Sequence, residues 1–113
     1  MALQNQNFEM WAKDTVVLQV TVTDDNNLPI DLSNMQITWV LFKGTSSYAN
    51  KTIGNGIAVT DVNNGVFQVT IQPSDTVNLT GLFNHECYIM DQYNNQSTVL
   101  TGIATIHPSS PFK

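Results

Sequence analysis

The chain has 113 residues, 42% of them hydrophobic, and its formal net charge is -5. A domain of this length buries about two-thirds of its unfolded surface, so a packed core is expected and disorder is not. Only 12% of the residues are charged, and the cations are four lysines without any arginine. Nucleic-acid binding requires clustered basic side chains that neutralise phosphates, so no nucleic-acid partner is predicted.

The sequence also argues against export and membrane insertion. The first residues lack a basic region followed by an apolar stretch, so we expect no signal peptide and synthesis in a cytoplasm. No apolar run reaches the length that spans a membrane. Cys87 is the single cysteine, so the fold must form without an internal disulfide.

Strands are predicted in the first part of the chain by alternation and by β-branched residues. Residues 8–11 form a short candidate strand, and residues 15–23 alternate between apolar and polar positions. Residues 24–27 read Asp-Asp-Asn-Asn, a composition typical of a turn. Residues 28–32 follow as an extended connection, and residues 35–42 as the next strand.

The strand at residues 35–42 is expected to organise the fold. One of its faces carries three apolar side chains that should point into the core: Ile37, Trp39 and Leu41. The other face begins polar and ends apolar with Val40 and Phe42. An apolar end is unusual for a sheet surface that faces water.

The second part of the chain continues the strand pattern. Residues 44–50 are predicted to be a polar loop, and Asn64-Gly65 indicates a hairpin turn with positive φ at both residues. Pro73 and Asp75 predict one helical turn that extends to Asn78. The remaining strands are expected at residues 51–53, 57–61, 67–71, 83–90 and 97–106.

Short strands, frequent turns and little helix predict an all-β fold. We expect an antiparallel, immunoglobulin-like β-sandwich of about seven to eight strands, in which the third strand pairs with the late strand and the late strand with the last. A single domain at residues 1–107 would be followed by a short, proline-broken tail at residues 108–113. Phe83 and His85 stand where an antibody domain has a tyrosine and a cysteine, so an antibody-type domain is a poor match.

No constellation of residues supports catalysis or a cofactor. His85 and Cys87 share the inward face of a strand, but zinc requires three or four such ligands, so they are expected to be a buried histidine and an inert thiol. The loop carboxylates lack the spacing of a calcium loop. They are Asp24, Asp25, Asp31, Asp61 and Asp91. We therefore predict a protein that is not an enzyme and binds no metal or cofactor.

The outward face of the paired strands is the candidate interface. Five apolar or aromatic side chains should lie there: Val40, Phe42, Tyr88, Met90 and Ile103. Such a patch would exceed what a soluble monomer usually exposes, and aromatic residues and Met are enriched in interface cores. The alternative is that a loop or the proline-rich tail folds over this face.

A second hypothesis is a module that binds carbohydrate or the surface of a host cell. Its support is three aromatic residues near predicted loops, which could stack on sugar rings: Trp11, Tyr48 and Tyr93.

Short motifs along nearly the whole chain resemble the N-terminal immunoglobulin-like domain of phage baseplate upper proteins. They are Phe8-x-Met10 with Lys13-Asp14-Thr15, and residues 27–33, 64–67, 81–86 and 102–106. Lys13 and Asn27 stand where that family usually has glycine. The resemblance implies a tailed-phage structural subunit of the tail, baseplate or capsid surface. It would be synthesised in the host cytoplasm and join other virion proteins, or copies of itself, through its sheet faces without catalysis.

Overall fold

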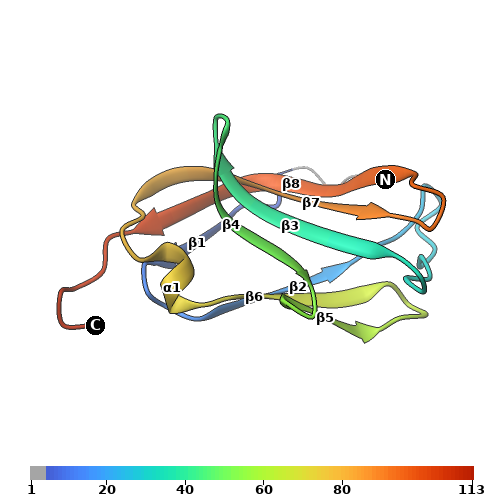
Figure 1. The fold of residues 1–113 in the computed structure, drawn as a ribbon, viewed down its shortest axis with the longest axis horizontal. Coiled ribbons are helices and arrows are strands. Elements are labelled where there is room, and N and C mark those ends of the chain that lie inside the picture. The colour runs from blue at the N-terminus through green and yellow to red at the C-terminus, as the bar shows by residue number, and fades with distance from the viewer. Residues whose placement is uncertain (1–4) are drawn as a thin grey trace.

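The computed structural model describes residues 5–113, and these form strands and a single helical turn (Figure 1). The elements in chain order are β1 (Phe8–Trp11), β2 (Val16–Thr21), β3 (Gln36–Lys43), β4 (Ser46–Ile53), β5 (Gly56–Asp61), β6 (Val66–Ile71), α1 (Pro73–Thr76), β7 (Gly81–Met90) and β8 (Gln96–His107). The all-β prediction is confirmed.

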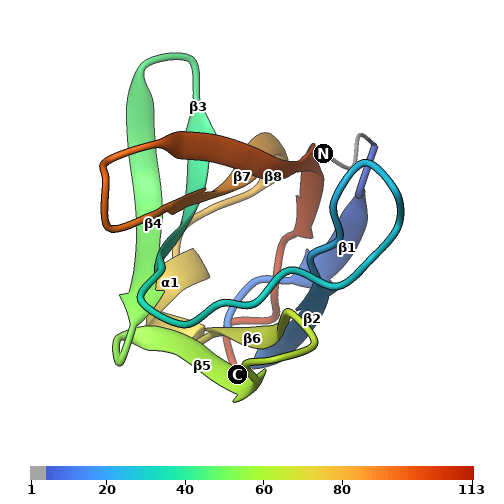
Figure 2. The same cartoon turned by 90° about the vertical axis from the view of Figure 1, so that its right-hand side faces the viewer.

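The eight strands form one hydrogen-bonded sheet in the order β1-β8-β7-β3-β4-β5-β6-β2. Neighbours are antiparallel except for β1 with β8 and β4 with β5. Seen along the long axis, the sheet curls around the core and is nearly closed like a barrel (Figure 2). The predicted pairing of β3 with β7 and of β7 with β8 is confirmed. A division into two separate sheets, as in a sandwich, is not confirmed.

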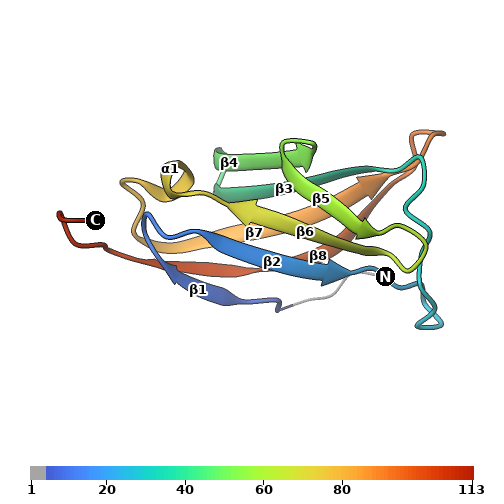
Figure 3. The same cartoon turned by 90° about the horizontal axis from the view of Figure 1, so that it is seen from below.

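The sheet bends sharply between β4 and β5. Only two residue pairs join these strands, Thr52 with Gly56 and Ile53 with Ile57. The chain turns there through positive φ angles of 84° at Gly54 and 97° at Gly56, a region that glycine occupies without steric cost. This corner carries the chain from one side of the core to the other (Figure 3).

The core is built from the inward positions of the alternating strands. Ile37, Trp39 and Leu41 are at most 1% exposed, as predicted for one face of β3. The inward side chains of β6 meet them and are also fully buried: Phe67, Val69 and Ile71. The burial of each such side chain stabilises the folded state by roughly 1.5–3 kcal/mol, because its apolar surface is removed from water.

Two predictions about the connections are wrong. The loop predicted at residues 44–50 is instead a turn at Gly44 and Thr45, after which β4 begins at Ser46. Polar residues are tolerated in this strand because its serines and asparagine face solvent while Ala49 points inward. The turn between β5 and β6 has positive φ at Gly65 (71°) but not at Asn64, because it is longer than a two-residue hairpin turn.

The predicted helical turn is present as α1. The Asp75 carboxylate accepts a hydrogen bond of 2.7 Å from the backbone N–H of Gln72, which caps the turn. Asp75 also forms an ion pair of 2.7 Å with the ammonium group of Lys51, so α1 is tied to β4. Within residues 5–113 no helix has the length and apolarity needed to cross a membrane.

Candidate protein–protein interface

The five predicted interface residues all lie on the outward face of β3, β7 and β8. These three strands are neighbours in the sheet (Figure 1). Ile103 is 43% exposed. The other four are half-buried: Val40, Phe42, Tyr88 and Met90. The strands hold them in place through backbone hydrogen bonds, so this face is presented by a rigid part of the fold.

The register of the strands places Glu86 in the middle of this face. Glu86 pairs with Val40 on β3 and with Thr101 on β8. Phe42 and Ile103 both pair with Asn84, which lies two residues before Glu86 on β7. They are therefore diagonal neighbours of Glu86, at about 7–8 Å between Cα atoms. Tyr88 is the next outward residue on the other side. On this face the Glu86 carboxylate therefore has four of the predicted apolar or aromatic residues as neighbours, together with the polar side chains of Asn84, Thr98 and Thr101.

The ends of the face differ in character. Leu82 is 60% exposed on the outward side of β7 and extends the apolar surface beyond Ile103. Sequence reasoning missed it because the strand was expected to start at residue 83, two residues after its actual start at Gly81. Met90 lies at the opposite end between two amide side chains, Gln36 and Gln96.

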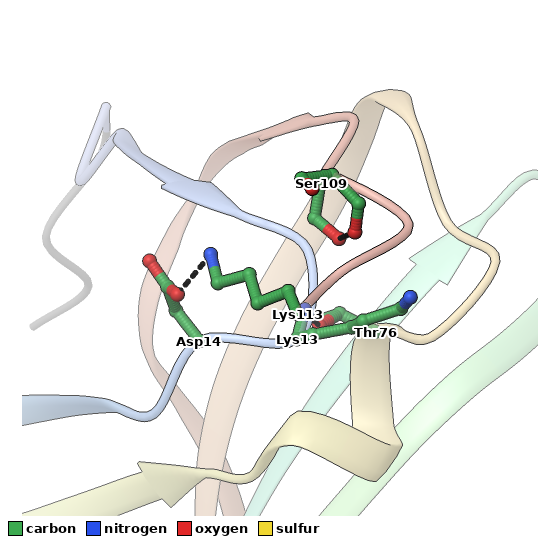
Figure 4. Close-up of polar contacts among 6 residues, drawn as sticks. Lys13, Asp14, Thr76, Ser109 and Lys113 are labelled. Carbon is green, nitrogen blue, oxygen red and sulfur yellow. Dashed lines mark hydrogen bonds and ion pairs between the residues drawn. The ribbon is translucent and has the colours of Figure 1, made fainter.

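The proline-rich tail does not lie over this face. After β8 the chain extends away from the body of the domain (Figure 1), and Lys113 forms an ion pair with Asp14 at the corner between β1 and β2 (Figure 4). Ser109 bonds to the adjacent Ser110, its hydroxyl donating to that carbonyl oxygen at 3.2 Å. The same corner is tied to α1 by a 2.9 Å hydrogen bond from the Lys13 N–H to the hydroxyl oxygen of Thr76.

His85 and Cys87 are structural residues of the core. The indole N–H of Trp39 donates to Nδ1 of His85 at 3.1 Å, so the ring proton is on Nε2, which donates to the Gln6 carbonyl oxygen at 2.5 Å. Burial lowers the pKa of His85 and keeps it neutral. Burial, with a smaller contribution from the Glu86 carboxylate, raises the pKa of the Cys87 thiol to about 12, which makes it a poor nucleophile.

A cavity of about 250 Å³ lies between β1 and β2, the two strands at the ends of the sheet. His85 and Trp39 line it together with apolar side chains from both strands. Both ring nitrogens of His85 are already hydrogen-bonded, so neither is free to bind a metal or a substrate there.

Two of the loop carboxylates, those of Asp24 and Asp91, stabilise turns by accepting backbone hydrogen bonds. Asp24 Oδ1 accepts hydrogen bonds from the backbone N–H groups of Asn26 (2.8 Å) and Leu28 (3.0 Å). Asp91 Oδ1 likewise accepts hydrogen bonds from the backbone N–H groups of Tyr93 and Asn95. The hydrogen bonds to Asp91 lower its pKa, and the one from the Asn95 N–H has the largest effect. Among residues 5–113 no three side chains of the metal-binding types come together.

The three aromatic residues of the carbohydrate hypothesis lie in different places. Trp11 is on β1 against the ring of His107 (4.8 Å between centroids), and Tyr48 is on β4 against Phe83 (5.2 Å). Tyr93 is 76% exposed in the turn between β7 and β8. Trp11 pairs with the end of β8 and Tyr93 precedes its start, so the length of that strand, roughly 35 Å, separates them. One copy of the domain does not form a sugar site from all three rings.

Comparison with known families shows which family the chain resembles. The family model described as the BppU N-terminal domain matches residues 2–108. The match includes the strands that carry the apolar outward face. A search of curated proteins found none that matches the chain.

Proposed function

Because the chain belongs to the BppU N-terminal domain family, a structural domain of the phage baseplate and hence of the virion, we propose that it is a non-catalytic assembly module. It docks on other virion proteins through the outward face of β3, β7 and β8. The residues that carry this contact are Val40, Phe42, Tyr88, Met90 and Ile103, with Leu82 at the edge.

The observation that supports this function most directly is the apolar character of a solvent-facing strand surface. Phe42, Tyr88 and Ile103 lie on the side of the sheet that faces away from the core. Aromatic residues and methionine are enriched where protein interfaces are fully buried. A rigid sheet face also loses little conformational entropy when a partner covers it.

Incorporation into phage particles tests the proposal. Val40→Asp and Phe42→Asp each place a carboxylate in the proposed contact, so both variants should be lost from purified particles while the free protein stays folded by circular dichroism. Val17→Asp is the matched control, since Val17 is 53% exposed on β2 and lies outside the face. Normal incorporation of both face variants would refute the proposed function.

A further inference from the structure

We propose that Glu86 is the centre of this interface and that it pairs with a lysine or arginine side chain of a different virion protein. The inference rests on the proposed function, because it specifies what the partner must present to the outward face of β3, β7 and β8.

The Glu86 carboxylate has little compensation within its own domain. The hydrogen bond that it accepts from the Thr98 hydroxyl is long, at 3.3 Å. No lysine within residues 5–113 forms an ion pair with it. Three of the lysines are engaged elsewhere: Lys51 with Asp75, Lys113 with Asp14, and Lys43 over the ring of Phe83 at 5.3 Å.

The apolar side chains around Glu86 determine what a partner must supply. A surface that packs on Val40, Phe42 and Ile103 also removes water from the carboxylate between them. An ionised carboxylate that is buried without a counter-charge is strongly unfavourable, and neutral hydroxyl donors do not remove that penalty. A cationic side chain does, and arginine is enriched in interface cores because it bonds a carboxylate through two parallel N–H groups.

The charges also argue against a second copy of the chain as the occupant. A two-fold axis through the centre of the face would bring two Glu86 carboxylates together, and like charges in a buried interface are repulsive. The chain contains no arginine and carries a net charge of -5, so a copy of itself is a poor source of the required cation. Charge complementarity therefore points to a partner with a different sequence.

Binding to phage particles assembled without this chain tests the pairing. Purified wild-type protein and variants are titrated onto such particles and the bound fraction is measured by co-sedimentation. Glu86→Gln keeps the shape and removes the charge, so the affinity should fall by about 30-fold or more, and Glu86→Lys should lower it further. Asp25→Asn and Asp25→Lys are the matched controls, because Asp25 is exposed in a turn outside the face, and they should change affinity by less than about threefold.

The other results separate the two proposals. If the Glu86 variants bind as wild type or more tightly while Phe42→Asp does not bind, the face is an interface and the cationic contact is refuted. If Phe42→Asp and Val40→Asp also bind as wild type, the proposed function itself fails. If light scattering shows a wild-type dimer that Phe42→Asp dissociates, the occupant is a second copy and the inference of a different partner is overturned.

Discussion

Lys13 occupies a backbone conformation that suits glycine. Its φ is 71°, and Asn27 has a φ of 62°. The left-handed region destabilises a residue with a Cβ by roughly 1–2 kcal/mol. Glycine avoids this cost but gains less than the full amount, because it also raises the conformational entropy of the unfolded chain. The backbone at both positions would thus suit glycine.

Lys13→Gly should therefore raise the free energy of unfolding by about 0.5–1 kcal/mol, measured by urea denaturation. The hydrogen bond from its N–H to Thr76 is kept, because it involves only the backbone of residue 13. Asn27→Gly should change stability by only a few tenths of a kcal/mol, since asparagine tolerates this conformation. A Lys13→Gly protein less stable than wild type would show that the lysine side chain matters more than the backbone.

His85 predicts how stability depends on pH. Burial lowers its pKa in the folded state below the ordinary 6.5, with an opposing hydrogen bond to Gln6. Between the lowered value and 6.5 the unfolded chain binds more protons at this residue. The contribution of His85 to the free energy of unfolding is therefore constant above that window and falls as the pH drops through it. Urea denaturation from about pH 5 to about pH 8 should show this slope.

The variant His85→Gln identifies the source of the slope. It should be less stable at all pH values but should lose the dependence that comes from His85. An unchanged slope in His85→Gln would contradict the assignment.

At the scale of elements, the corner between β4 and β5 depends on Gly56. A Cβ at this position would collide with the side chain of Lys51, whereas one at Gly54 would meet nothing within 4 Å. Both have positive φ, so both alanine variants carry a backbone cost of roughly 1–2 kcal/mol. Gly56→Ala should lose about 1–3 kcal/mol more in thermal or urea denaturation, because Lys51 must move. Equal losses would show that the collision is relieved without cost.

The ion pair between Lys51 and Asp75 joins β4 to α1, and its two partners should respond differently to substitution. The Lys51 side chain is 9% exposed and that of Asp75 is 18% exposed. Asp75→Ala leaves a buried ammonium group unpaired and should cost about 3–5 kcal/mol of unfolding free energy. Lys51→Met keeps the buried volume and should cost less than about 2 kcal/mol. A greater loss in Lys51→Met would contradict this account.

At the scale of the whole molecule, Cys87 reports on opening of the core. Its side chain is fully buried between strands, and its thiol has a pKa of about 12. Alkylation by iodoacetamide near neutral pH should therefore be far slower than for a free thiol, and should rise with urea in parallel with global unfolding. Rapid labelling without denaturant would show that the nearly closed sheet opens locally.

Much of the core and of the local structure could be read from the sequence. Alternation placed Trp39, Phe67 and their neighbours inside, because a strand with one buried face must repeat every two residues. The turn residues marked most strand ends, and the short apolar strands indicated an all-β fold. Alternation likewise placed Val40 and Phe42 on the opposite face of their strand.

Features that depend on contacts between distant parts of the chain were decided only by the tertiary structure. Ser46–Ile53 has no hydrophobic alternation and is a strand because β3 pairs with it. The single curled sheet results from the corner at Gly54 and Gly56, whose angles no short-range pattern reports. Glu86 lies among Val40, Phe42 and Ile103 because the register of three strands aligns them, and register is a long-range property. The sequence by itself thus determined which side chains face outward, and the pairing of the strands decided which of them are neighbours.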